Sequence, residues 1–173
     1  GMDCVTVWQN NSGTVAGGRS ALSGDAVQCG KRVLRHQADA IRDLADRLDD
    51  RFAQAVDLIF GCAGRVITCG IGKSGQIARK ASATLASTGT PSFFLHAAEA
   101  VHGDLGMVAA GDVVIAYSHS GETDEVVRLF APIRELGAAS ILISGRETSS
   151  AGRMADIVLP TGVTEESCPN NLA

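Results

Sequence analysis

Apolar runs that pass into glycine or serine and then into a helical pattern occur twice in the middle of the chain. The first run, 65–69, is rich in Val and Ile and is followed by the glycines of 70–75. Apolar residues then recur at helical spacing over 74–87, and Gly89 is placed to end that helix. The second run, 113–117, leads into the polar stretch 118–123 and another helical pattern. The chain is therefore predicted to contain two strand–loop–helix units.

Three more apolar runs complete a predicted sheet. Strands are expected at 91–96, 140–144 and 157–159, with a short helix at 149–154 and with Pro132 kinking or breaking the helix before Gly137. Strands that alternate with helices indicate a doubly wound α/β fold, in which a five-stranded parallel sheet is flanked by helices. In the strand order 2-1-3-4-5 the winding direction reverses between the first and third strands. The two loops would then face each other across one crevice.

The residues before the first strand divide into two parts. The stretch 1–24 is rich in Gly, Ser, Asn and Thr, and we expect a mobile arm there. From about Asp25 to Phe60 the pattern is helical, and Asp49 or Asp50 could cap a second segment, giving two helices or one bent helix. This region could cover a sheet edge or pack against its copy in a dimer. Residues 25–173 are expected to form a single domain.

Charge and cysteine content narrow the range of partners. A net charge of −4 at pH 7 gives no basic footprint for nucleic acid or an anionic membrane. The five cysteines form no C-x-x-C pair, which argues against a disulfide framework or structural zinc and favours a reducing cytoplasm. The sequence has no apolar run near the roughly 20 residues of a membrane span, and we expect no signal peptide. A small-molecule ligand is therefore expected.

The first loop matches the dinucleotide fingerprint G-x-G-x-x-G from Gly70 to Gly75. That fingerprint also needs an acid at the end of the second strand, where this chain has His96, with Glu99 a little beyond. A Walker A loop fails because its first glycine would fall on Ile67. Neither nucleotide motif explains the second, hydroxyl-rich loop.

That second loop indicates a phosphate site. Ser118, Ser120 and Thr123 lie within six residues, and the N–H groups around Gly121 could wrap a phosphate without a basic side chain. The ordinary alternative is a Ser/Thr-rich helix cap. The matching first loop, with Gly72 and Ser74 as expected phosphate ligands, favours the phosphate interpretation.

Five longer segments of the chain are distinctive in combination: 72–75, 86–94, 96–106, 118–122 and 166–169. Together they resemble the sugar isomerase (SIS) domain of D-arabinose 5-phosphate isomerases of the KpsF/GutQ type. The resemblance runs from about Gln28 to the last residue. It implies isomerisation of D-ribulose 5-phosphate to D-arabinose 5-phosphate through an enediolate, on the way to the Kdo sugar of lipopolysaccharide. A non-catalytic sugar-phosphate-binding SIS domain and a nucleotide-dependent enzyme are the alternatives.

The resemblance also implies roles for individual residues. Lys73, Glu125 and Glu166 match active-site positions of the family. A lysine could stabilise the enediolate oxygen, and either glutamate could be the base that moves the proton. His119 and His102 are expected to contact substrate.

Metal binding and assembly complete the expectations. In a helix, His96, Glu99 and His102 would share a sector of about 120°, which would permit zinc, although no cofactor is expected to be required. A homodimer or homotetramer is expected. The family continues past the Cys168 segment into a helix with an active-site histidine, whereas this chain ends at Ala173 and is expected to lack that helix.

Overall fold

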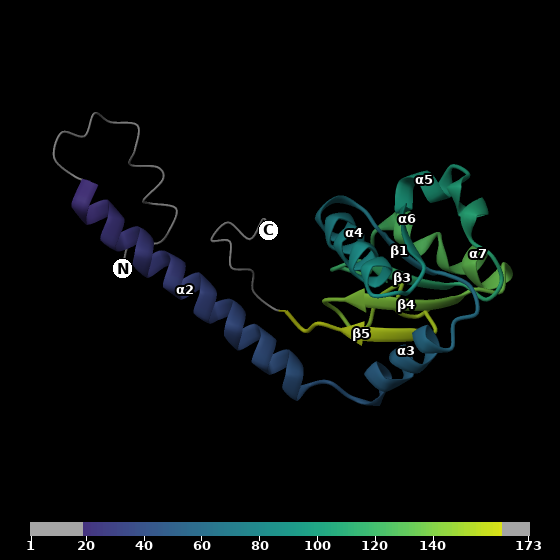
Figure 1. Ribbon diagram of the computed structural model, residues 1–173, viewed down its shortest axis with the longest axis horizontal. Coiled ribbons are helices and arrows are strands. Elements are labelled where there is room, and N and C mark those ends of the chain that lie inside the picture. Colours follow the sequence, from purple (N-terminus) through teal and green to yellow (C-terminus); the bar gives the residue numbers. More distant parts are fainter. Residues whose placement is uncertain (1–18, 164–173) are drawn as a thin grey trace. The chain divides into compact units, whose positions relative to one another are not determined.

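The computed structural model describes residues 19–163 (Figure 1), with side chains described from residue 26 onward. The chain divides into two compact units, and everything from α3 to β5 belongs to the unit Leu48–Gly162. The helices are α2 (Arg19–Asp46), α3 (Asp50–Phe60), α4 (Gly72–Ser87), α5 (Ala97–Val101), η2 (Asp104–Met107), α6 (Asp124–Val127) and α7 (Phe130–Glu135). The strands are β1 (Val66–Gly70), β2 (Ser92–His96), β3 (Val113–Tyr117), β4 (Ala139–Ser144) and β5 (Ile157–Pro160).

The predicted N-terminal helical region is two helices. Asp49 caps α3 by accepting a hydrogen bond from the backbone N–H of Arg51 at 3.0 Å, which confirms the expected break. The first helix begins at Arg19, six residues before the expected Asp25. Extending an existing helix costs less than nucleating one, so the glycine and serines there do not stop it. Residues 1–18 of the predicted arm lie outside the described residues.

The sheet has the predicted order, β2-β1-β3-β4-β5, with every neighbouring pair parallel. β1 lies between β2 and β3, and its last residue, Gly70, is in register with His96 and Tyr117. Because β1 is an interior strand and all five of its residues are buried, its sequence is mostly apolar rather than alternating. The winding direction reverses between β1 and β3, as expected for this order.

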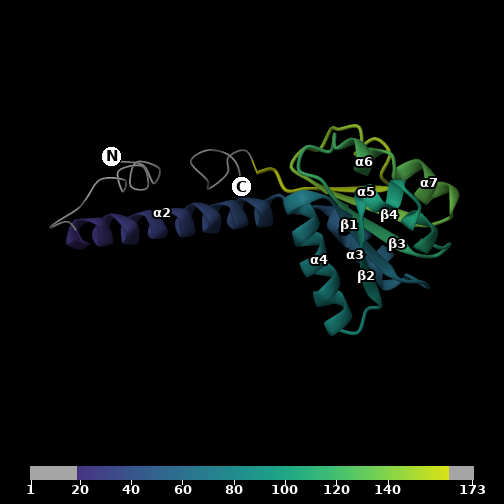
Figure 2. The same ribbon diagram turned by 90° about the horizontal axis from the view of Figure 1, so that it is seen from above.

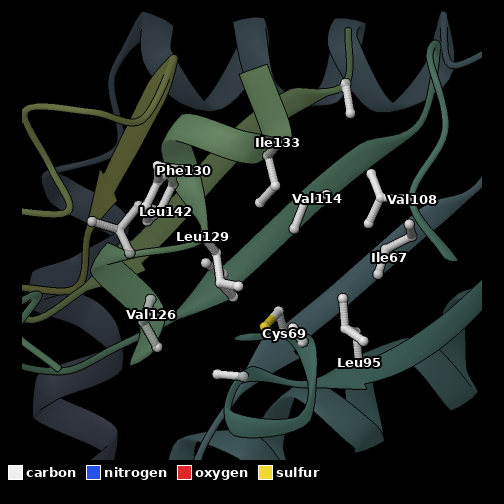
Figure 3. Close-up of a cluster of buried hydrophobic side chains, with 14 of the residues drawn as sticks. Ile67, Cys69, Leu95, Val108, Val114, Val126, Leu129, Phe130, Ile133 and Leu142 are labelled. Atoms are coloured by element: carbon white, nitrogen blue, oxygen red, sulfur yellow. The ribbon is translucent and has the colours of Figure 1, made fainter. Parts of the chain in front are cut away.

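Alternate residues of the strands pack on opposite faces of the sheet. On one face, strand residues such as Ile67, Val114 and Leu142 belong to the larger core cluster, which also includes residues of α6 and α7 (Figure 3). The other face packs against Ala55 of α3 and Leu85 of α4. Helix α4 runs along β1 and β2 (Figure 2). Both faces are therefore covered, and the strand ends position the functional groups.

Two local features are explained by backbone hydrogen bonding. The helix after Thr123 breaks at Arg128–Leu129 into α6 and α7, as expected because Pro132 has no N–H to donate to the carbonyl of residue 128. The predicted short helix at 149–154 is wrong, since this stretch forms turns. Ser149 Oγ there accepts the N–H of Gly152 at 3.0 Å, and a serine that bonds nearby backbone in this way favours a turn over a helix.

Three of the cysteines, and the lengths of the helices, can be compared with what the sequence predicted. Cys62 and Cys69 are free thiols, and burial raises the pKa of Cys69 to about 12, so this thiol is inert at neutral pH. Cys29 is disulfide-bonded, which differs from the expectation of fully reduced cysteines. Within residues 19–163, no helix is both long and apolar enough to span a membrane.

Candidate functional site

The segments that follow β1 and β3 leave the sheet side by side. Gly70 and Tyr117 are register partners on neighbouring parallel strands, so Ile71 and Ser118 both start at the carboxyl edge of the sheet. This edge, at the reversal of winding, is where open α/β sheets bind ligands. The two loops predicted from the sequence, which form the two walls of the predicted crevice, therefore begin at the same edge of the sheet.

The first wall is the start of α4, because the helix begins within the predicted glycine loop. Gly72 has a φ of +58°, a left-handed conformation that glycine adopts without strain, and the helix begins at this residue. A Cβ atom on Gly75 would lie only 3.1 Å from the carbonyl oxygen of Gly70, so the helix starts in close contact with β1. Ile71 provides no side-chain cap. The N–H groups of Gly72, Lys73 and Ser74 have no hydrogen-bond partner within the described residues.

The second wall is the loop 118–123, whose hydroxyls hold its shape. Ser118 is only 4% exposed, and its Oγ accepts the N–H of Gly121 at 3.1 Å and lies 3.3 Å from Thr123 Oγ1. Ser120 Oγ accepts the N–H of Glu122 at 3.1 Å. A hydroxyl that accepts a bond keeps its own proton, which it can donate to an anion.

Backbone donors of this second loop are also unused. Thr123, the N-cap of α6, makes no side-chain cap bond. Among the hydrogen bonds of residues 19–163, none uses the N–H of His119, Ser120 or Thr123. By contrast, α3 is capped by Asp49. Uncapped donors are thus found on both walls of the predicted crevice, where an anion could satisfy them.

Lys73 and Glu125 lie in the first turns of α4 and α6, the helices that follow these two walls. Lys73 is exposed and Glu125 is half-buried. Within the described part of the chain neither side chain forms an ion pair, whereas the neighbouring Asp124 pairs with Arg128 at 2.7 Å. Both charges are therefore available to a ligand. The third predicted catalytic residue, Glu166, lies outside the described residues.

His96 and His102 do not form a metal site with their neighbours. They flank α5 as its N-cap and C-cap, so they do not share one helical face as expected. No group of three His, Cys, Asp or Glu side chains within residues 26–163 is arranged to hold a metal ion. Nδ1 of His96 is buried without a partner, and its ring contacts Phe94 edge-on with the ring centroids 6.2 Å apart. One orphaned nitrogen is not a zinc donor set, so the described residues do not fit the metal. His102 is exposed.

Residues that the sequence pattern does not single out support the second loop from behind. The carbonyl oxygen of His119 accepts hydrogen bonds from Gly145 N–H at 3.0 Å and from Ser144 Oγ at 3.3 Å. A Cβ on Gly145 would lie 2.5 Å from the His119 ring, so the ring packs directly on this glycine. These contacts join segments about 25 residues apart. Local motifs carry no signal for them.

Comparisons with known proteins agree with this architecture. A family model described as the SIS domain matches residues 59–173. Arabinose 5-phosphate isomerase KdsD of Escherichia coli K12 is 47% identical over 149 residues, which is 86% of this chain and 45% of that protein. A probable arabinose 5-phosphate isomerase of Haemophilus influenzae is 50% identical over 140 residues, 81% of this chain and 42% of that protein. The chain thus spans less than half the length of these relatives.

Solved structures show the same fold. The structure of c3406 from E. coli CFT073 in complex with arabinose 5-phosphate superposes with a TM-score of 0.82 at 40% identity, covering 87% of this chain and 80% of that one. A phosphosugar isomerase described as putative, involved in capsule formation in Bacteroides fragilis, superposes with a TM-score of 0.80 at 34% identity, covering 86% and 79%.

Proposed function

The chain belongs to the SIS domain family, and from that premise we propose that it is an aldose–ketose isomerase acting on D-ribulose 5-phosphate and D-arabinose 5-phosphate. The observation that carries the proposal is the pair of uncapped segments after β1 and β3, whose free N–H groups suit a phosphate ester. Supporting it, relatives at 46–50% identity are arabinose 5-phosphate isomerases, and c3406 binds arabinose 5-phosphate.

In the proposed reaction the phosphate is held by Gly72, Ser74 and the hydroxyls and N–H groups of the loop 118–123. A base removes a proton from C1 of the ketose, the electron pair forms a C1=C2 double bond, and the C2 oxygen gains negative charge. Lys73 stabilises that oxygen. Return of a proton to C2 and transfer of the O1 proton to the C2 oxygen give the aldose, so no external oxidant or reductant is consumed. Glu125 and Glu166 are both candidates for the base.

We place the product upstream of Kdo in lipopolysaccharide synthesis, and the enzyme in the cytoplasm. A doubly charged sugar phosphate does not cross a membrane unaided, which supports a location where the substrate is made. The proposed ligands on the two walls, including the exposed His119 and His102, are polar groups of the protein itself. No step in the proposed reaction requires a metal.

We also propose that the chain forms a homodimer or homotetramer. Val27, Leu34 and Ile41 recur every seven residues along α2 and are 54%, 67% and 68% exposed. A seven-residue apolar repeat is the pattern of helices that pack on one another. Sedimentation of the purified protein as a monomer at micromolar concentration would contradict this assembly.

The test is turnover of ribulose 5-phosphate by the purified chain and by two matched lysine variants. Lys73→Met should lower kcat by about 100- to 1000-fold, because it removes a charge that acts on the enediolate oxygen. Lys80→Met is the control, since Lys80 lies on the same helix but donates to Thr84 Oγ1 at 2.9 Å instead. Its kcat should stay within about twofold. Glu125→Gln should abolish turnover if Glu125 is the base and weaken it only mildly if Glu166 is.

Other results would select the alternatives. Binding of pentose phosphate without any turnover would favour a sugar-phosphate-sensing SIS domain. Protection against thermal unfolding by NAD(P), but not by pentose phosphates, would favour the nucleotide-binding alternative.

A further inference from the structure

We infer that Glu122 is a positioning residue that fixes the phosphate-binding loop by anchoring it to the turn at 149–152. This inference rests on the proposed use of the loop 118–123 as a phosphate site. It adds a role for a side chain that bonds to a distant segment of the chain. The connection spans 28 residues of sequence.

The anchoring contact is a hydrogen bond to a carboxylate. Glu122 Oε1 accepts the backbone N–H of Ser150 at 2.9 Å. Hydrogen bonding from Ser150, helped by the nearby charges of Arg153 and Arg146, lowers the pKa of Glu122 below its ordinary value. The carboxylate is therefore ionised at neutral pH, as a strong acceptor should be.

The turn at 149–152 packs closely against the loop 118–123. Gly121 has a φ of +65°, and a Cβ there would lie 2.2 Å from Ser149 Oγ. Ser149 is buried, and its Oγ accepts the N–H of Gly152 at 3.0 Å. The carbonyl oxygen of Gly121 accepts the N–H of Ala151 at 3.0 Å. Carbonyl and carboxylate acceptors of the loop are thus both used on the side of the turn.

The loop bonds to the turn through its acceptors and leaves several of its donors unbonded. Gly121 and Glu122 accept bonds from the turn, while the N–H groups of His119, Ser120 and Thr123 have no partner within the described residues. The bonds to the turn use acceptors of the loop and leave these N–H donors unbonded, so they hold the loop in a conformation that can bind an anion. Without these bonds, part of the binding energy is spent ordering the loop, which weakens binding without altering the chemistry.

The experiment compares Glu122→Ala and Glu122→Gln with Glu135→Ala, a matched removal of an exposed carboxylate on α7. Glu122→Ala should raise KM for ribulose 5-phosphate, and the inhibition constant of inorganic phosphate, by roughly three- to tenfold while kcat stays within about twofold. Glu122→Gln should largely restore both constants, because its amide oxygen can still accept the Ser150 N–H. Glu135→Ala should change neither.

A second measurement does not depend on turnover. The amide proton resonance of Ser150 should shift with pH and titrate with a midpoint below about 4.3, the ordinary glutamate value. That shift should be lost in Glu122→Gln. A Ser150 resonance that does not titrate, or a fall in kcat at constant KM, would overturn the inference. A different result would separate the two proposals. If the unaltered protein shows no turnover, and Glu122→Ala binds phosphate more weakly than it does, the proposed isomerase activity is refuted and the positioning role is supported.

Discussion

At the scale of single residues, Asp112 joins the amino-terminal ends of β1 and β3, far along the sheet from the proposed site. This buried carboxylate accepts hydrogen bonds from the backbone N–H of Arg65 at 2.7 Å and of Ala109 at 2.8 Å. The Arg65 guanidinium donates to it at 3.1 Å. Burial alone would raise the pKa of Asp112, but these donors outweigh it and the pKa is lowered. The folded state therefore binds a proton here less readily than the unfolded chain.

The lowered pKa sets the sign of a pH dependence. The contribution of Asp112 to stability is fully present above its unfolded pKa of about 3.9 and is lost as pH falls through the folded pKa. At pH 7, Asp112→Asn should lower the free energy of unfolding by about 1–3 kcal/mol, because it replaces a charged acceptor of several bonds. Urea unfolding of both proteins at pH 7, 5 and 3 checks this. The difference should shrink between pH 5 and 3, and a difference that grows would contradict the assignment.

At the scale of elements, the start of α4 depends on two glycines in contact. Gly75→Ala would place a Cβ 3.1 Å from the carbonyl oxygen and 3.2 Å from the carbonyl carbon of Gly70, and neither atom can rotate away. The helix start must then move by a few tenths of an ångström, carrying the N–H groups of Lys73 and Ser74 with it. The crowding should outweigh the better helix propensity of alanine and cost about 1–2 kcal/mol.

Thermal unfolding and substrate KM measure the two consequences of Gly75→Ala. We expect a lower Tm and a KM for ribulose 5-phosphate raised by roughly fivefold or more. Gly30→Ala is the control, because Gly30 lies within α2 and, apart from its chain neighbours and the backbone of its own helix, no described atom lies within 4 Å of the added Cβ. That change should leave the protein equally stable or slightly more stable. An unchanged KM in Gly75→Ala would show that the position of α4 does not govern binding.

The same elements show which features a single sequence can predict. β1 and β3 are apolar runs bounded by turn residues, and their identity and order follow from local pattern and from the handedness of crossovers. The stretch 149–154 forms turns rather than the predicted helix, and the bond from Gly152 N–H to Ser149 Oγ that favours a turn is invisible in the sequence pattern. Helical period also grouped His96 with His102, but α5 is only five residues long and places them at its two ends.

At the scale of the whole molecule, the sequence predicts the residues of the proposed phosphate site but not the residues that support them. Ser118 and Ser120 belong to one short motif, and the crevice follows from the strand order. Glu122, Ser149 and Gly145 act through contacts made after the chain has folded back on itself, and periodicity does not encode those contacts.

The unit Leu48–Gly162 contains both core clusters and both walls of the proposed phosphate site, whereas Glu166 lies beyond it. A fragment of residues 48–162 should therefore unfold in one cooperative transition, because its apolar core is complete. It should be stabilised against heat by inorganic phosphate or arabinose 5-phosphate, since ligands that bind only the folded state raise its Tm. If Glu166 is the base, the fragment should bind without turnover, and the whole chain should do both. A fragment that folds but gains no thermal protection from either ligand would place the essential phosphate contacts outside the loops after β1 and β3.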